Sequence, residues 1–178
     1  MKNRELFNLY AGDIIGHKLF LQTKQVFSHG ITTIYDHSIA VAELAFSMSE
    51  DKPGIDKKCV VRAGLLHDFF LYEWHIPGMR YMFHGWAHPA IAAQNAREIF
   101  GVSDKEYSCI RTHMWPWTLL HLPRCREGWI ISLADKIVAL KETIFNRGKR
   151  RLLPKPLKTE DPEGGIAVFG AHKHHIHP

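Results

Sequence analysis

The chain has 178 residues, of which 46% are hydrophobic, and a formal net charge of +5. This length favours one domain with a buried core and disfavours two. Its longest apolar runs, such as residues 130–134, are far shorter than the roughly 20 residues of a membrane-spanning helix. Residues 1–10 lack the apolar block of a secretory signal. We therefore expect a cytoplasmic protein with no membrane partner.

The cysteines, Cys59, Cys109 and Cys125, are odd in number, widely spaced and without a C-x-x-C pair. This pattern indicates neither a disulfide framework nor a thiolate zinc site. We expect three reduced thiols.

Positive charge is concentrated near the end of the chain. Residues 1–146 hold 16 Lys/Arg and 15 Asp/Glu, whereas residues 147–178 hold 7 and 3. We interpret the basic run as a solvated helix end and tail, with contact to phosphates of a substrate or of nucleic acid as the alternative. The histidine-rich ending, HKHHIHP, is interpreted as a surface tail.

Helical periodicity dominates from about residue 33 to 146 and predicts an all-α bundle. We expect residues 1–32 to form a helical segment that packs on the core of residues 33–146. Residues 147–178 contain several Pro and Gly residues and are expected to form an irregular tail.

The first core helix is expected after Thr33, which forms a capping pattern with Asp36, and it ends before the next Pro-Gly pair. Asp56 can cap a second helix, whose residues 60–71 leave almost no polar face. A helix that is apolar on all sides is central and buried.

Pro89 fits the first turn of a third helix that ends near Phe100. Because proline disfavours helical geometry in the residue before it, His88 would lie at the entrance of this helix. His84 would then precede the helix.

Ser103 and Glu106 predict a capping box at the start of a fourth helix, which carries His113 and closes before Pro116. A fifth helix is expected from about residue 126 to 146.

Two acids occupy apolar surroundings on these helices. Asp68 lies in the apolar stretch of the second helix, and the neighbours of Asp135 at helical spacing are mostly apolar. A carboxylate taken out of water costs several kcal/mol unless a cation or hydrogen bonds compensate it. Because residues 63–73 contain no Lys or Arg, we expect that cation to be a metal ion.

Histidines take comparable positions on other helices. His37 and His113 both have apolar neighbours at helical spacing. A single histidine of this kind is more often a core residue than a ligand. Together with two buried acids on successive helices, however, these histidines predict nitrogen and oxygen ligands that converge on a metal pair.

The order of these residues resembles the H...HD...H...H...D pattern of HD-domain phosphohydrolases. The matching residues are His37, His67, Asp68, His88, His113 and Asp135. The local segments "YDHSIAVA", "AGLLHDF", "HPAIAAQNA" and "SLADKIVALKE" are similar to the ligand-bearing helices of that family. The resemblance covers about residues 29–142 and implies a single HD-domain helical bundle, followed here by an irregular C-terminal tail.

The resemblance also implies a dinuclear metal site. A first metal would be held by His37, His67, Asp68 and Asp135, and Asp68 would bridge to a second metal bound by His88 and His113. Two divalent transition metal ions suit this donor set: iron, manganese, nickel, cobalt or zinc. A water made acidic by the metals would attack phosphorus, which implies hydrolysis of a phosphomonoester or phosphodiester, with a nucleotide or related small molecule as substrate.

Candidate catalytic and substrate-binding residues surround these ligands. Lys136 is the first choice for a phosphate contact, since many relatives carry a lysine beside the last ligand. The catalytic candidates are Asp68, Lys136 and His84. The other candidate substrate contacts are Arg62, Arg80, Arg124, His29, Trp115 and, again, His84.

The chain departs from the family pattern after the HD pair. Many relatives carry a small residue and a phosphate-binding lysine there, whereas this chain has Phe69, Phe70 and Leu71, which weakens the phosphate inference. The segment after His113 lacks the G-Y-P signature of cyclic-di-GMP phosphodiesterases, so that substrate is not expected.

Two other functions stay open at this point. One is a mixed-valent di-iron oxygenase of the HD type, which uses nearly the same ligands. The other is a non-enzymatic helical domain that binds metal, or that binds nucleic acid through the basic residues after Arg147. The sequence leaves the substrate, the metal and the oligomeric state open.

Overall fold

The computed structural model describes residues 2–28, 31–70 and 81–150. Within these ranges the fold is all-α, as the sequence predicts, and an isolated bridge between Phe27 and Thr33 is the one strand-like pairing. No helix among them is long and apolar enough to cross a bilayer. The elements are α1 (Lys2–Ile15), α2 (Lys18–Gln22), η1 (Thr23–Gln25), α3 (Ile34–Ser49), α4 (Lys57–Leu66), α5 (Tyr81–Phe100), α6 (Asp104–Thr112) and α7 (Arg126–Arg150).

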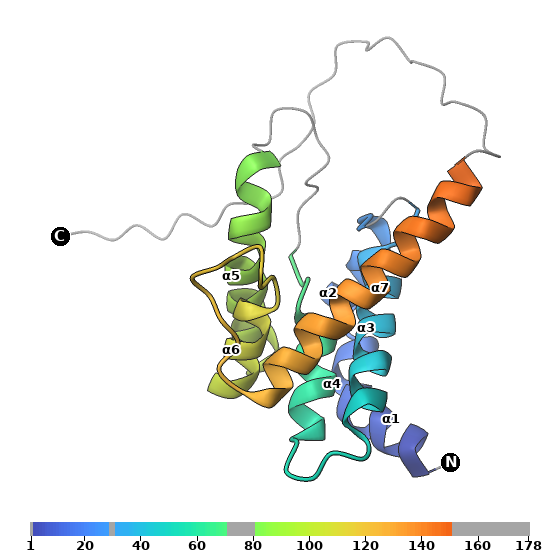
Figure 1. The fold of residues 1–178 in the computed structure, drawn as a ribbon. Coiled ribbons are helices and arrows are strands. Elements are labelled where there is room, and N and C mark those ends of the chain that lie inside the picture. The colour runs from blue at the N-terminus through green and yellow to red at the C-terminus, as the bar shows by residue number, and fades with distance from the viewer. Residues whose placement is uncertain (1, 29–30, 71–80, 151–178) are drawn as a thin grey trace.

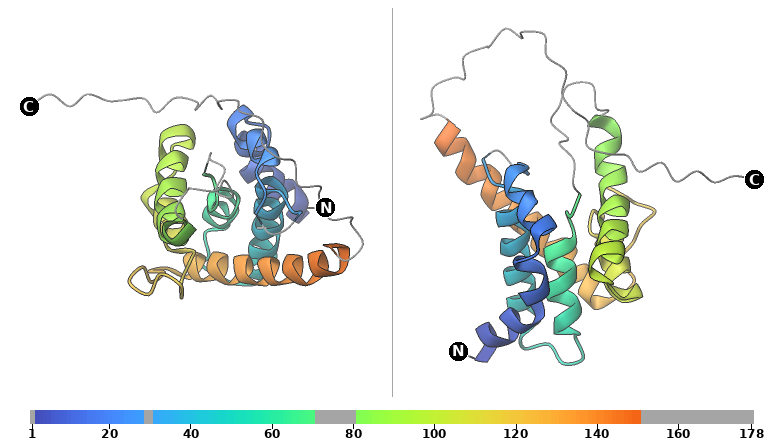
Figure 2. Two further views of the ribbon diagram at one scale, coloured as in Figure 1. Left: turned by 90° about the horizontal axis from the view of Figure 1, so that it is seen from above. Right: turned by 180° about the vertical axis from the view of Figure 1, so that it is seen from behind.

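Helix α4 lies at the centre of the bundle. It contacts α1 and α3 on one side and α5 and α6 on the other, and α7 crosses α3, α4 and α6 (Figure 1). Figure 2 shows α7 spanning the width of the bundle along one side. Residues 59–66 of α4 are all buried, which confirms the prediction of a central apolar helix.

Helices α3 and α4 approach each other closely at Gly64. A Cβ atom at Gly64 would lie 3.0 Å from Cα of Ala42, tighter than ordinary van der Waals contact. Glycine at this position therefore allows the two helices to pack closely.

Three helix starts agree with the predicted caps. The side chain of Thr33 accepts a hydrogen bond from the backbone N–H of Asp36, and Asp56 accepts one from that of Cys59. Ser103 and Glu106 form a complete capping box at α6. These caps satisfy backbone donors that the first turn of a helix leaves unpaired.

Helix α5 begins at Tyr81, so the predicted start at Pro89 is wrong. Proline removes one backbone donor and crowds the preceding turn, but a helix held by packing tolerates it. Ala92, Ala93 and Ala96 provide that packing, since all three are buried. His88 consequently lies inside the helix, not at its entrance.

Helix α4 ends at Leu66, earlier than the apolar run that continues to residue 71 indicates. His67 is the C-cap, and the backbone N–H of Phe69 donates to the carbonyl of Leu66. The chain then turns, since the N–H of Phe70 donates to the carbonyl of Asp68. His67 and Asp68 thus lie at the end of a buried helix.

Candidate metal centre

Five helices bring the six predicted ligands together. His37 lies in the first turn of α3, His67 and Asp68 at the end of α4, and His88 within α5. His113 is the C-cap of α6, and Asp135 lies in the middle of α7. All six side chains are buried.

The carboxylate of Asp68 lies among three imidazoles. Its Oδ1 is 3.3 Å from Nε2 of His88 and 3.5 Å from Nε2 of His113, while Oδ2 is 3.6 Å from Nε2 of His67. The two oxygens therefore face different histidines.

Asp135 also lies near Nε2 of His67. Its Oδ1 is 3.2 Å from Nε2 of His37 and 3.8 Å from Nε2 of His67. Its Oδ2 accepts a hydrogen bond from Nζ of Lys136 at 3.0 Å.

Backbone carbonyls fix the orientation of two histidines. Nδ1 of His67 lies 2.8 Å from the carbonyl of Gly64, and Nδ1 of His113 lies 2.8 Å from that of Ile110. A carbonyl only accepts hydrogen bonds, so each Nδ1 carries the proton, and the Nε2 lone pair points into the cluster. Burial lowers the pKa of His113 to about 3, which keeps this imidazole neutral.

Glu142 holds the third histidine and was missed by sequence reasoning. Its Oε2 is 3.0 Å from Nδ1 of His37, 105 positions away along the chain. Glu142 follows Asp135 by seven residues, two helical turns, so both acids share one face of α7. The seven-residue spacing between the two acids was the signal from which the sequence could have predicted the position of Glu142.

The pKa of His37 reflects its two carboxylate neighbours. Burial alone would lower this pKa, but hydrogen bonds with Asp135 and Glu142 outweigh burial and raise it to about 10. Ligation through Nε2 would release the proton on that nitrogen, while Glu142 would keep the proton on Nδ1.

Both acids of the cluster stay ionised. Burial would raise the pKa of Asp68, but its electrostatic interaction with His67, and after that with His88, holds it well below the usual range. Burial opposes ionisation of Asp135 too, and the hydrogen bond from His37 more than offsets it. The cluster thus combines two carboxylates with neutral and ionisable imidazoles.

The donor atoms form groups that could hold metal. Ligand atoms within 4.8 Å of one another form three overlapping groups: His37, His67 and Asp68; His67, His113 and Asp135; and Asp68, His88 and His113. Nε2 of His67 and Oδ1 of Asp68 are buried without a hydrogen-bond partner. Buried polar atoms of this kind are costly unless something binds them, and mixed nitrogen and oxygen donors suit transition metals.

Lys136 lies at the edge of the cluster. Its Nζ donates to Oδ2 of Asp135 and, at 2.6 Å, to the carbonyl of His113. The side chain is 29% exposed, so it links the buried ligands to the surface. Three other predicted contacts lie outside the described residues: His29, Arg80 and the side chain of His84.

Arg62, a predicted substrate contact, makes structural contacts in the bundle. It is buried, and its guanidinium pairs with Asp13 of α1 and with Glu106 of α6. It also donates to the carbonyl of Phe100 at 3.0 Å. The sequence could not reveal these partners, because they come from three other segments.

Two further predicted contacts lie on the loop between α6 and α7. The ring of Trp115 packs edge-on against Trp129, with centroids 4.7 Å apart, which is aromatic packing. Arg124 is exposed and lines a cavity of about 370 Å³ together with Tyr107 and Arg111. The structure thus places neither side chain among the metal-ligand groups described above.

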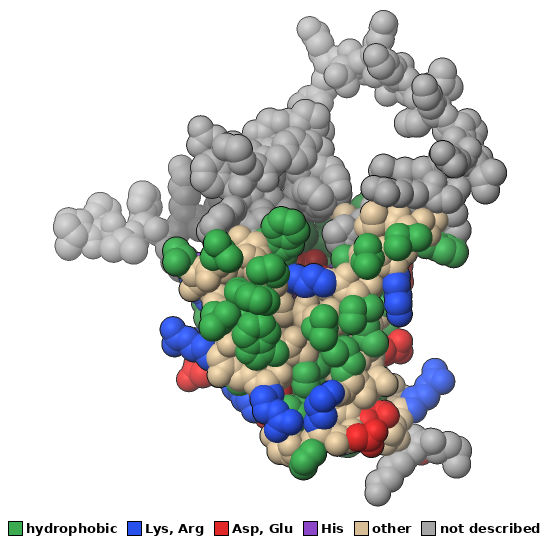
Figure 3. All heavy atoms as spheres, in the orientation of Figure 1, with side chains coloured by type: hydrophobic (Ala, Val, Ile, Leu, Met, Phe, Trp, Pro, Cys, Tyr) green, Lys and Arg blue, Asp and Glu red, His purple; other side chains and the backbone are tan. Residues whose placement is uncertain are grey.

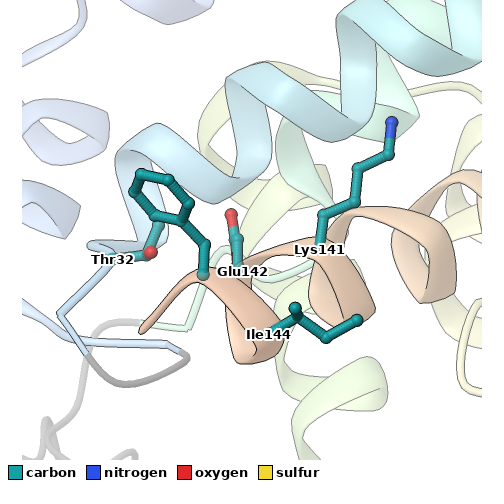
Figure 4. A pocket seen from close by; sticks show the side chains of 5 residues that line it. Thr32, Lys141, Glu142 and Ile144 are labelled. Carbon is teal, nitrogen blue, oxygen red and sulfur yellow. The ribbon is translucent and has the colours of Figure 1, made fainter. Parts of the chain in front are cut away.

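A groove adjoins the cluster at Glu142. It has a volume of about 480 Å³ and is lined by Thr32, Lys141, Glu142, Ile144 and Phe145. In Figure 4 the Glu142 side chain stands between Thr32 and Lys141. Since Glu142 also touches His37, one residue separates the groove from a candidate ligand.

A helical bundle whose core holds converging histidines and aspartates defines a class of metal-binding α-helical proteins. The HD domain family matches residues 34–140, which include all six candidate ligands, and the chain belongs to this family. Comparisons with curated proteins and with solved structures found no match.

Proposed function

We propose that this protein hydrolyses a phosphoester bond of a small molecule at a dinuclear metal site. The observation that carries the proposal is the position of Asp68, which belongs to two of the three ligand groups and faces histidines with both oxygens. A carboxylate between two sets of imidazoles could supply one oxygen to each of two metals.

The residues divide between two metals. His37, His67, Asp68 and Asp135 would hold the first, and Asp68, His88 and His113 the second. Metals bound there would acidify a coordinated water and polarise the phosphoryl oxygens.

The protein's own residues then orient the substrate. The ammonium group of Lys136, partly exposed beside Asp135, is suited to bind a phosphoryl oxygen. When Nε2 of His37 binds a metal, Glu142 would keep the remaining proton on Nδ1. The hydrogen bonds that hold Lys136 to Asp135 and His37 to Glu142 exist before substrate arrives, so these side chains need no reorganisation during the reaction.

The groove beside Glu142 is our candidate for the organic part of the substrate. Its volume of about 480 Å³ lies in the range of small-molecule sites. Ile144 and Phe145 offer apolar contacts, and Lys141 offers positive charge. This lining suits a substrate with an apolar or aromatic group near its phosphate.

The test compares metal content and phosphate release in wild type, Asp68→Asn and Asp51→Asn. Asp51 is exposed, so Asp51→Asn controls for the loss of an acid outside the cluster. We expect about two metals per chain in wild type and Asp51→Asn, and loss of both metal and phosphate release in Asp68→Asn. The histidine-rich ending is the same in all three chains and cancels in the comparison.

Wild type that holds no stoichiometric metal after reconstitution would contradict the proposal. Anaerobic assays with manganese separate hydrolysis from the oxygenase alternative. Phosphate release under these conditions supports the hydrolase. In a separate aerobic assay, iron-dependent oxygen consumption without phosphate release would refute it.

A further inference from the structure

The loop between α6 and α7 exposes large apolar side chains. Trp117 is 72% exposed, Leu119 74% and Leu120 88%. Residues of this size normally bury most of their surface, and contiguous exposed patches mark interaction sites.

The outer side of α7 continues this surface. Leu133, Leu140 and Ile144 are exposed and recur at the spacing of one helix face. The loop lies against the start of α7, because Trp115 contacts Trp129 and the hydroxyl of Ser132 donates to the carbonyl of Trp115. We name the whole surface the apolar face, with these members: Trp117, Leu119, Leu120, Trp129, Leu133, Leu140 and Ile144.

Figure 3 shows hydrophobic side chains gathered across this side of the molecule, with Lys and Arg side chains among them. Residues 113–150 contain seven Lys/Arg but only three acids, Glu127, Asp135 and Glu142.

All three acids are turned toward the protein. Glu127 is buried against Lys105, Asp135 lies in the metal centre, and Glu142 binds His37. Arg124, Arg126 and Lys141 are exposed. The charge that this part of the chain presents outward is therefore positive.

We propose that the apolar face docks on the surface of an anionic lipid membrane. Headgroups of negative charge attract Arg124, Arg126 and Lys141, and the acyl boundary beneath them accepts the leucines. Tryptophan favours this interface because its ring is apolar and its N–H is polar. A second copy of the chain would instead bring Arg124, Arg126 and Lys141 of two chains together, which disfavours a symmetric dimer through this surface.

This inference does not rest on the proposed function, although Lys141 and Ile144 also line the groove beside Glu142. It replaces the expectation that the protein has no membrane partner, which rested on the lack of a spanning helix. Binding in the plane of the interface needs no spanning helix.

The test is co-sedimentation of the full chain with vesicles. One set contains phosphatidylcholine alone, and the other contains phosphatidylcholine with phosphatidylserine. We expect at least about tenfold tighter binding to the anionic vesicles at low salt, with weakening as salt is raised. Leu120→Ser should lower the affinity about tenfold, because it removes a leucine side chain that docking would bury in the lipid.

The matched control is Leu9→Ser on α1, since Leu9 is 74% exposed and far from the loop in sequence. Its vesicle binding should equal that of wild type. Arg124→Gln/Arg126→Gln is a second test, and it should reduce binding to anionic vesicles only. Circular dichroism verifies that each variant is folded.

Three outcomes would overturn the proposal. They are no binding of wild type to anionic vesicles, equal binding of Leu120→Ser and wild type, and a lipid-free dimer that Leu120→Ser dissociates. The second outcome would mean that charge elsewhere, without the apolar face, draws the protein to lipid. The third would assign this surface to a second copy.

Discussion

At the level of single residues, Glu142 lies outside the predicted ligand set but contacts one of its members, His37, and can change the metal affinity of that ligand. Its carboxylate accepts from Nδ1 of His37, and such partners raise the basicity of a metal-ligating imidazole and fix its orientation. Glu142→Gln should therefore lower metal affinity by about 10- to 100-fold while the chain stays folded. Isothermal titration with manganese measures the effect.

Glu43→Gln is the control, because Glu43 is exposed on α3, the helix that carries His37. Equal manganese affinity in Glu142→Gln and wild type would show that Glu142 does not position the ligand.

The buried contacts of Arg62 lead to a prediction about the stability of the fold. Arg62→Met leaves Glu106 buried without its cation, and we expect a loss of about 3 kcal/mol or more in the free energy of unfolding. Arg62→Lys should not restore it, because lysine lacks the planar fork that reaches Asp13, Glu106 and the carbonyl of Phe100 together. Urea denaturation provides the measurement.

Arg97 pairs with Asp104 in an exposed position and supplies the comparison. Arg97→Met should cost no more than about 1 kcal/mol. Similar losses for Arg62→Met and Arg97→Met would contradict a buried structural role for Arg62.

At the level of helices, Gly64 sets the distance between α3 and α4. Gly64→Ala places a methyl group 3.0 Å from Cα of Ala42, and we expect a loss of about 1–3 kcal/mol. Gly12→Ala in α1 is the matched control, because a Cβ there meets nothing within 4 Å. The higher helix propensity of alanine should make Gly12→Ala neutral or stabilising by up to about 1 kcal/mol. Thermal unfolding of both variants tests the contrast, and equal shifts would refute it.

Glu127 joins three helices at the start of α7. Its carboxylate accepts from the backbone N–H of Asp56 and from Nζ of Lys105, both at 2.8 Å. Burial would raise its pKa, but the hydrogen bond from Lys105 and backbone N–H groups outweigh burial and lower the pKa from 4.5 to about 2. The ionised carboxylate thus stabilises the folded protein.

The sign of the pH effect follows from this lowered pKa. Wild type should exceed Glu127→Gln in stability by about 2 kcal/mol near neutral pH. That advantage should be lost as the pH falls from 4.5 towards about 2, where the folded protein binds the proton too. Urea denaturation at several pH values tests it, and a difference independent of pH would contradict it.

For the whole molecule, the candidate metal centre should couple metal binding to stability. Its residues come from α3, α4, α5, α6 and α7, so metal ions that bind only the folded chain stabilise all five helices together. Metal at 100 times its dissociation constant should add about 2.7 kcal/mol for one site. Thermal unfolding with and without a chelator measures the change. The same shift in Asp68→Asn would show that the metal binds elsewhere.

The sequence by itself determined the helix caps and the order of the candidate ligands. Thr33, Asp56 and Ser103 act on backbone groups within three residues, so their effect is readable locally. Asp68 and Asp135 have apolar neighbours in the sequence, and this pattern predicted buried charges that need a cation or hydrogen bonds.

Only the tertiary structure decided which residues meet across the bundle. The partner of His37 is 105 positions away at Glu142, and the partners of Arg62 lie on other segments. Packing also kept Pro89 inside α5, where the local signal predicts a helix start. Contacts between distant segments depend on how whole helices pack, and that information is not contained in any single stretch of the chain.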